Sequence, residues 1–459
     1  MKSTFKNHFL ILTISMGVFA SVMSTSMLTI AFPDIVSDFN ISYETLQWRN
    51  ILFFALFAVG LPFFGKTADH FGARRQFFTG IVLFALSTLC SGLTRDWNFF
   101  LIFQSLQGLA DSMIVPVQVI FIRQSFPENK IGWAFGWFSG TLATATLISP
   151  AIGGLLIKHY HWNSIFWCLF GLSIISLIMA LIHLPRGLSP EKKSKIPFVG
   201  AFGLLMTVIG IQCLFMNNLS TASKLVWAIL AAAGIIGIIV SQKSNNGEGA
   251  IFPPGAFHNK TFILACLRVF CLYLVSNAIS LYAPSYLRDV HAIPPDLVGL
   301  IILIDSVMGL AFSGIAGRAA DKNPRFTLAV GMILSLGGSV FFWFSGNFHH
   351  LLLFIAIYLL LGIGGTIAMP SQNKIALLSV PPEQTGAFIG FFQMIQFGTG
   401  AFAAGLFSRL VEGPEIGKIS ASGFQMMITC AIALQLIALT TLLLERTGIK
   451  SEKGVNKTT

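Results

Sequence analysis

The sequence is built from long apolar runs that alternate with short polar segments. A helix needs about 20 mostly apolar residues to cross the hydrocarbon core of a bilayer, and fourteen runs reach that length. A spanning segment must satisfy its backbone polar groups internally, which an α-helix does. We therefore predict an all-α polytopic membrane protein with spans at 9–32, 46–65, 76–94, 98–122, 131–157, 164–184, 197–217, 224–241, 261–287, 296–317, 325–345, 350–371, 386–410 and 423–445.

The composition excludes several soluble classes. Charged residues make up only 10% of the 459 residues, whereas soluble domains carry about 25%. The net charge of +11 does not indicate nucleic-acid binding, because the cations fall in short segments between apolar runs. The chain contains neither a phosphate-binding Gly-x-x-x-x-Gly-Lys-Ser/Thr loop nor a nucleophilic constellation at a plausible site. We expect no enzymatic activity, no cofactor and no metal.

The lysines and arginines predict how the spans are oriented. Of 29 cations, 21 fall on the side of the segment 66–75, Arg268 falls inside a span, and seven fall on the opposite side: Arg49, Arg95, Lys158, Lys224, Arg288, Arg409 and Lys418. This bias predicts that both termini are cytoplasmic and that the protein lies in the inner or plasma membrane. The first apolar run continues to Phe32, so we expect an uncleaved first helix.

A segment between the second and third spans concentrates glycine and charge. It reads Gly65-x-x-x-Asp69-x-x-Gly72-x-Arg74-Arg75 and closely resembles the signature loop of the major facilitator superfamily. Gly65 permits close helix approach, Gly72 can take a positive φ in a tight turn, and Asp69 can lie at a helix N-terminus. The resemblance implies that this loop takes part in gating.

The two halves of the chain resemble each other. The loop recurs in weaker form as Gly317-x-x-x-Asp321, and Pro116-x-Gln118 recurs as Pro370-x-Gln372. Such parallel repeats are typical of the superfamily and imply a substrate site near the bilayer midplane. Two spans match neither half. We predict the superfamily fold with a six-helix bundle over 1–190, a two-helix insert over 191–255, and a second six-helix bundle over 256–459.

Two stretches resemble the fourteen-span drug:proton antiporters of this superfamily, the branch that contains multidrug and tetracycline exporters. The first span ends in Ser24-Thr-Ser-Met-Leu-Thr-Ile-Ala-Phe-Pro33, with Ser24 where the branch usually has Asp. The fourth span carries Gln104-x-x-Gln107-Gly108, with Gln104 where the branch has an Arg associated with proton coupling. The two usual charges are therefore missing.

The fifth span resembles the antiporter motif of the same branch. It contains Ser149-Pro150-Ala-Ile-Gly153-Gly154, with Ala145 and Ser149 at the usual Gly positions. Small residues allow close helix packing, and a proline can kink a span. We expect Pro150, Gly153 and Gly154 to serve helix packing.

A proton-linked mechanism must then use another ionisable group. Asp111 lies near the middle of the fourth span, where a carboxylate costs at least about 2.5–3.5 kcal/mol and normally faces water or a partner. We predict that Asp111 exchanges the coupled proton. The alternative is a fixed cation partner on another helix.

The second half carries two further intramembrane charges, Arg268 and Asp305. They lie on consecutive spans, so we predict that they pair. Structural support, a coupling switch and an anchor for a charged substrate all stay open as roles for this pair.

Polar and aromatic side chains within the spans are candidates for a substrate cavity: Ser24, Thr25, Gln104, Gln107, Gln118, Trp137, Tyr273, Asn277, Gln393 and Gln396. The resemblance implies a secondary transporter that works by alternating access. We favour proton-coupled export of a small amphipathic compound, with uptake of a flat aromatic metabolite such as riboflavin as the alternative. A non-transporting membrane sensor with the same fold is a third hypothesis. The expected partners are substrate, protons and the bilayer, with no nucleic acid, and we expect a functional monomer.

Overall fold

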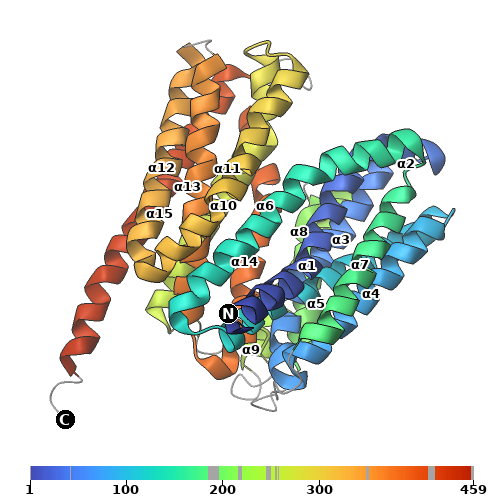
Figure 1. Cartoon of the computed structure of the whole chain (residues 1–459). Coiled ribbons are helices and arrows are strands. Elements are labelled where there is room, and N and C mark those ends of the chain that lie inside the picture. Colours follow the sequence, from blue (N-terminus) through green and yellow to red (C-terminus); the bar gives the residue numbers. More distant parts are fainter. Residues whose placement is uncertain are drawn as a thin grey trace. The chain divides into compact units, whose positions relative to one another are not determined.

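The computed structural model describes residues 2–41, 43–184, 196–214, 220–243, 250–253, 256, 258–347, 351–411 and 419–455. Figure 1 shows that its regular structure is helical. The longer helices are α1 (Lys2–Ile30), α3 (Tyr43–Phe71), α4 (Ala73–Leu93), α5 (Trp97–Ser125), α6 (Glu128–His159), α7 (Ser164–His183), α8 (Phe198–Leu214), α9 (Thr221–Lys243), α10 (Lys260–Asp289), α11 (Pro295–Lys322), α12 (Pro324–Phe344), α13 (Leu351–Leu378), α14 (Thr385–Val411) and α15 (Ala421–Val455). Shorter pieces are α2 (Phe32–Asp38), η2 (Ser345–Asn347) and η3 (Pro382–Gln384).

Each predicted span corresponds to one of these longer helices, so the fourteen-span prediction is confirmed. By length and composition, 12 helices of the described residues can cross a membrane. Helix α8 is apolar but shorter, and α14 is 27 residues long.

The prediction of a loop over residues 66–75, between the second and third spans, is wrong. Helix α3 continues through Gly65 and Asp69 to Phe71, and α4 begins at Ala73. Only Gly72 is non-helical, with φ 91°, as its glycine predicted. The hydropathy count ended this span too early, because a helix whose end lies in water can continue through polar residues.

The chain divides into two compact units. The first comprises Met1–Ser125, Thr144–Pro254 and Val380–Met394, and the second comprises Phe126–Ala143, Gly255–Ser379 and Ile395–Thr459. Helices α6 and α14 therefore contribute residues to both units. The division by sequence at residues 190 and 255 stays a prediction, because these units follow spatial contacts rather than the repeat.

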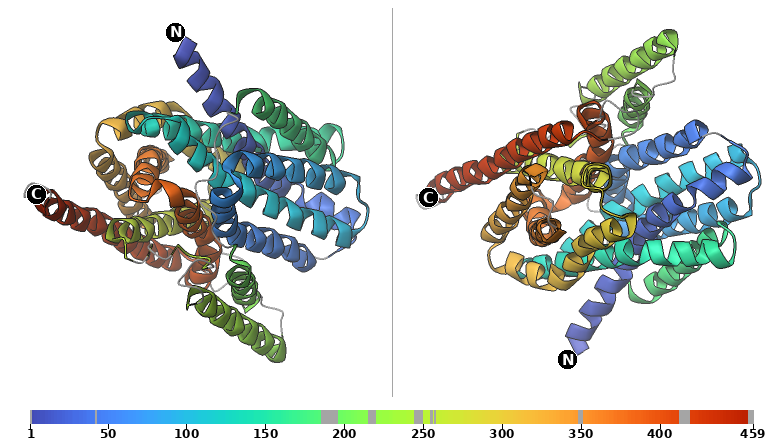
Figure 2. Two further views of the ribbon diagram at one scale, coloured as in Figure 1. Left: turned by 90° about the horizontal axis from the view of Figure 1, so that it is seen from below. Right: turned by 90° about the horizontal axis from the view of Figure 1, so that it is seen from above.

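Within the first unit, α5 packs against α3 and α4, and α7 packs against α1 and α4. The extra helices α8 and α9 lie side by side, and α8 packs on α3 (Figure 2). A small core of Val59, Leu204 and Ile251 holds this insert on α3. Beside it, the buried Lys66 ammonium donates to the Ala250 carbonyl at 3.0 Å.

Within the second unit, α13 packs against α11 and α12, and α15 packs against α10 and α12 (Figure 1). The sequence repeat has a structural counterpart in each unit. Gln118 Nε2 donates to the Ile14 carbonyl on α1 at 2.7 Å, and Gln372 Nε2 donates to the Ala265 carbonyl on α10 at 2.8 Å. Equivalent glutamines thus tie equivalent pairs of helices together.

Candidate functional site

Asp111 lies in the interior of the first unit. Its side chain is buried on α5, the helix that packs against α1, α3 and α4. Within the described part of the chain, neither carboxylate oxygen has a hydrogen-bond partner. Ser21 on α1 lies beside the carboxyl without meeting hydrogen-bond geometry. A buried carboxylate that lacks hydrogen bonds costs several kcal/mol, so this group favours the protonated form or a conformation that hydrates it.

A polar network runs along α5 next to this acid. Arg49 donates from Nε and Nη2 to Gln104 Oε1, at 3.0 and 2.8 Å. Gln104 Nε2 donates to Ser91 Oγ on α4 and to Gln107 Oε1, both at 3.0 Å. Gln107 Nε2 in turn donates to Ser24 Oγ on α1. The predicted residues Ser24, Gln104 and Gln107 are thus brought together in one buried network that joins four helices.

Sequence reasoning missed Arg49, which it counted among the cations of the opposite side. The structure buries this side chain to 2% exposure. Besides Gln104, it contacts the Asn50 amide oxygen at 3.1 Å and the Phe53 ring at 4.5 Å. A signal was available, because Arg49 is the fourth residue of the predicted apolar span 46–65.

A second polar cluster lies in the other unit, between α10 and α14. Gln396 Nε2 donates to the Tyr273 hydroxyl. Asn277 Nδ2 donates to Thr399 Oγ1 at 3.1 Å and to the Tyr273 carbonyl at 2.8 Å. Tyr273, Asn277 and Gln396 were predicted, whereas Thr399 was not.

The remaining cavity candidates are scattered. Thr25 donates to the Val22 carbonyl of its own helix, and Gln118 binds the α1 backbone, so both side chains serve helix structure. Gln393 is buried in the first unit. Trp137 belongs to the second unit, where it is half exposed and packs edge-on against Trp133.

The predicted pairing of Arg268 with Asp305 is wrong. Arg268 is fully buried and donates from Nη2 to Glu445 on α15 at 2.8 Å, while Arg325 reaches the same carboxylate at 3.5 Å. Helix α10 packs far more extensively on α15 than on α11, so its arginine meets an acid near the end of the chain. Asp305 is exposed on α11, has no ion-pair partner among the described side chains, and lies against Gly362 of α13.

Asp69 caps the N-terminus of a helix, as predicted. Its two carboxylate oxygens accept from the backbone amides of Gly386 and Ala387, each at 3.0 Å, at the start of α14. A Cβ built on Gly65 would lie 2.1 Å from the Gly386 carbonyl oxygen, so only glycine permits this approach. Arg74 and Arg75 lie in the first turn of α4, the helix that follows.

Asp321 repeats this arrangement in the second unit. Its oxygens accept from the amides of Gly132 and Trp133 near the start of α6, at 2.6 and 2.7 Å. A Cβ built on Gly317 would lie 2.6 Å from the Gly132 carbonyl oxygen, so this approach also requires glycine. The second site differs in one respect, since the buried Lys374 donates to Asp321 at 2.8 Å.

The antiporter-like motif lies in the C-terminal half of α6, which runs through Pro150 without interruption. Gly153 packs against Met27 of α1, where a Cβ would lie 3.3 Å from the Met27 side chain. Gly154 has open space at that position among the described residues. Gly153 therefore lies where two helices approach each other, and the role of these residues in helix packing stays a prediction.

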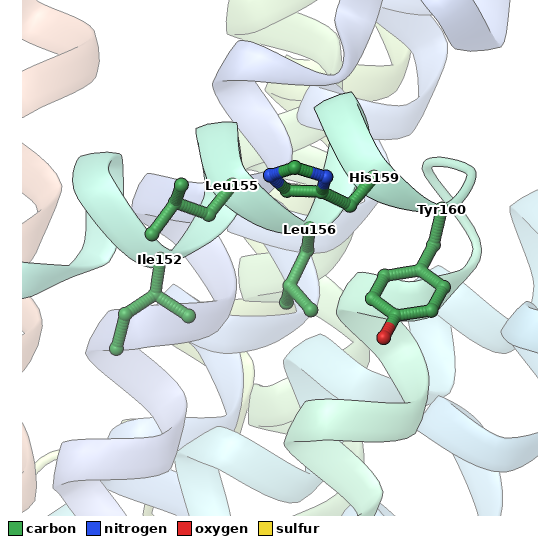
Figure 3. A pocket seen from close by; sticks show the side chains of 5 residues that line it. All are labelled: Ile152, Leu155, Leu156, His159 and Tyr160. Atoms are coloured by element: carbon green, nitrogen blue, oxygen red, sulfur yellow. The ribbon is translucent and has the colours of Figure 1, made fainter.

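A shallow, open pocket lies at the end of α6 and in the turn after it. Its lining is Ile152, Leu155, Leu156, His159 and Tyr160, all from one stretch of chain (Figure 3). None of the predicted site residues lines it. The described residues also contain no group of three or more His, Cys, Asp or Glu that could hold a metal ion.

The chain resembles known transporters in sequence and in fold. The riboflavin transporter RibZ of Clostridioides difficile is 24% identical over 87% of this chain and 88% of its own length. The tetracenomycin C resistance and export protein of Streptomyces glaucescens is 25% identical over 83% of this chain and 72% of its own. The proton:xylose symporter XylE superimposes with a TM-score of 0.70 at 14% identity, with 96% of each chain covered, and this likeness concerns the fold alone.

The family model supports the same assignment over most of the chain. The model of the Major Facilitator Superfamily matches residues 14–404. The sequence repeat is also visible in the structure. Asp69 and Asp321 each cap a helix start, and Gln118 and Gln372 each bind the backbone of a neighbouring helix. This chain belongs to the Major Facilitator Superfamily, and it is a multi-pass secondary transporter.

Proposed function

We propose that this protein is a proton-coupled transporter that exports a small amphipathic or aromatic compound, and that Asp111 takes up and releases the coupled proton. The observation that carries this proposal is the buried Asp111 carboxyl, whose two oxygens have no hydrogen-bond partner among the described residues. Intramembrane acids that lack a structural partner are commonly used for transport.

The mechanism follows from the energetics of that carboxyl. When Asp111 carries a proton, it is neutral and can stay in a dry interior at little cost. When it loses the proton, the bare carboxylate favours a conformation that gives it water. Proton binding from one side of the membrane and release to the other thereby bias the two conformations in turn.

The capped acids Asp69 and Asp321 supply a conformational element for this cycle. Each holds a helix start, of α14 or of α6, through two charge-assisted hydrogen bonds to backbone amides. Such contacts can form in one conformation and break in another. We assign both acids to gating, together with Gly65, Gly72, Gly317 and the cations Arg74 and Arg75.

Uptake of a flat aromatic metabolite is the second candidate. It is favoured by the riboflavin transporter among the relatives and by Ser24 and Gln104, which stand where exporters of this branch carry charge. In both cases we propose a monomer in the plasma membrane with cytoplasmic termini and no catalytic activity. Tyr273, Asn277 and Gln396 are the side chains we propose for substrate contact.

The test is accumulation of three labelled compounds in cells that express the protein: a lipophilic cation, a tetracycline and riboflavin. Export predicts lower accumulation that a protonophore reverses, and Asp111→Asn should remove the effect while the protein still reaches the membrane. Higher accumulation of riboflavin would replace export by uptake. Full proton-driven transport by Asp111→Asn would overturn the assignment of the proton site.

A further inference from the structure

The four residues 250–253 follow the inserted helices α8 and α9 in sequence, and they are packed like part of a core. Ala250 and Ile251 are 0% exposed, and Pro253 is buried as well. A segment that only connects two parts of a chain normally runs over the surface, where water satisfies its backbone. We infer that residues 250–253 form a strap that holds the N-terminal part of α14 on α3, so that the two-helix insert regulates this contact. The inference rests on the proposed gating role of Asp69, and it adds a function for the insert.

Helix α3 presents one face to α14. Gly65 of α3 packs so closely on the Gly386 carbonyl that a Cβ would find no room there. Gly390, one turn further along α14, packs equally closely on the Leu61 carbonyl of α3. Asp69 binds the amides at the start of α14 beside these contacts. All of them must break together when α14 leaves α3.

A neighbouring face of α3 carries the strap. Val59 and Lys66 are seven residues apart, which is about two helical turns, and so they lie on the same side of the helix. Val59 forms a core with Leu204 of α8 and with Ile251 of the strap. Lys66 donates from Nζ to the Ala250 carbonyl at 3.0 Å. The strap is therefore attached to α3 along two turns of the helix.

The strap also reaches α14. The rings of Phe252 and Phe391 pack against each other with their centroids 4.8 Å apart. Met394 packs against the core that contains Ile251. Phe391 and Met394 follow the docked Gly390 within about one helical turn. Because the strap is attached to α3, α14 cannot leave α3 without breaking the ring pair and the contact of Met394.

The second unit provides a comparison, because the insert belongs to the first unit. Lys66 follows Gly65, and Arg318 follows the equivalent Gly317. Lys66 is 8% exposed, whereas Arg318 is exposed to solvent. Burying an ammonium is costly unless an acceptor binds it, and the strap supplies such an acceptor in the Ala250 carbonyl. The burial of this cation thus accompanies the presence of the insert.

The expected effect is a change in how often α14 leaves α3. The contribution of an aromatic pair corresponds to about a two- to tenfold change in an equilibrium, so removal of the Phe252 ring should raise the undocked population by about that factor. The amides of Gly386 and Ala387 are bound to Asp69 in the docked state, and they exchange with solvent when the contact opens. If residues 250–253 were only a connector, loss of the ring would leave this exchange unchanged.

The experiment is hydrogen–deuterium exchange, followed by mass spectrometry, on the purified full chain in lipid nanodiscs without substrate. Phe252→Ala should accelerate exchange in a peptide that covers residues 384–389 by about two- to tenfold. Phe99→Ala removes an exposed ring that stacks on Phe103 of its own helix, and it serves as the control with no acceleration expected. The amides that Asp321 binds near the start of α6 are the internal reference and should keep their exchange rate.

A second variant makes the test independent of a folding defect in the strap. Phe391→Ala removes the partner ring from α14 and should accelerate exchange of the same amides. Since both variants remove one shared contact, Phe252→Ala/Phe391→Ala should exchange clearly more slowly than the product of the two single effects predicts.

Unchanged exchange of residues 384–389 in a folded Phe252→Ala would overturn the strap and leave the proposed function standing. Equal acceleration of the reference amides in α6 would also overturn it, because the loss of stability would then be general. Single effects that multiply in the double variant would do the same, since the two rings would then act independently. Absence of transport in the accumulation experiment would instead overturn the proposed function and leave the strap on α14 standing.

Discussion

Two arginines are buried to the same degree in the two units, and their surroundings differ completely. Arg268 is 0% exposed and touches the Glu445 carboxylate, whereas Arg49 is 2% exposed and touches only amide oxygens among the described groups that accept from it. The charge of Arg268 is balanced by the carboxylate in contact with it. Among the described side chains, neither Arg49 nor Asp111 has an oppositely charged group in contact with it. Burial alone therefore does not reveal what a charge does; the nature of its acceptors does.

The largest effect on transport should come from replacing Asp111. Asp111→Asn should abolish uphill transport, because the site can no longer change its charge, while exchange of labelled for unlabelled substrate continues, because exchange needs no net proton movement. Thermal stability should not fall, since a buried and unpaired carboxyl is replaced by a neutral isostere. Both transport modes can be measured in proteoliposomes. Loss of exchange together with uphill transport would indicate a substrate-binding role instead.

Variants of the buried Arg268–Glu445 pair should lower the stability of the protein. Glu445→Gln leaves Arg268 buried with no counter-charge, which should cost about 3–5 kcal/mol. Denaturant unfolding of the purified protein in mild detergent checks this. Asp289→Asn removes an acid from the ion pair with the exposed Arg288 and should cost about 1 kcal/mol or less. Equal losses for the two variants would remove the distinction drawn between them.

The helix starts capped by Asp69 and Asp321 allow a similar comparison, with smaller expected losses of stability. Asp321→Asn should destabilise more than Asp69→Asn, because it also leaves the buried Lys374 without its carboxylate. Loss of the cap charge itself is worth about 0.5–2 kcal/mol.

The control variant is Asp96→Asn. Asp96 is an exposed acid that accepts from the amides of Asn98 and Phe99. The expected order of stability loss in denaturant is Asp321, Asp69, Asp96, and a reversed order of the first two would contradict the role given to Lys374.

The smallest effect should come from the second arginine at Glu445. Arg325 lies 3.5 Å from that carboxylate and is one-third exposed. Arg325→Gln should cost about 1 kcal/mol or less, as solvent-screened pairs do, whereas Arg268→Gln should cost several times more. The ratio of the two losses in unfolding free energy measures how much contact and burial, rather than charge alone, determine the contribution of an arginine to stability.

Much of the fold could be predicted from the sequence, because the bilayer requires long apolar helices. The repeat also carried geometric information, since Gln118 and Gln372, and Asp69 and Asp321, occupy equivalent places. The helix ends were less predictable, as the continuation of α3 to Phe71 shows.

Pairings between distant spans could not be predicted. Adjacency in sequence suggested Asp305 as the partner of Arg268, but the packing of α10 on α15 supplies Glu445. The same limitation concealed Arg49, whose partner Gln104 lies 55 residues away. Hydropathy states that a charge is inside the membrane and does not state which helix faces it.

The sharing of α14 between the units has a consequence for biosynthesis. The first unit includes Val380–Met394, and the amides that Asp69 binds belong to that stretch. When residue 254 leaves the ribosome, more than a hundred residues must still be made before these amides exist, a delay on the order of 10 s at typical elongation rates. During that interval Gly65 and Asp69 have been synthesised but lack their partners. The N-terminal half of the chain is therefore inserted before it can be completed, and its final assembly depends on residues translated near the end.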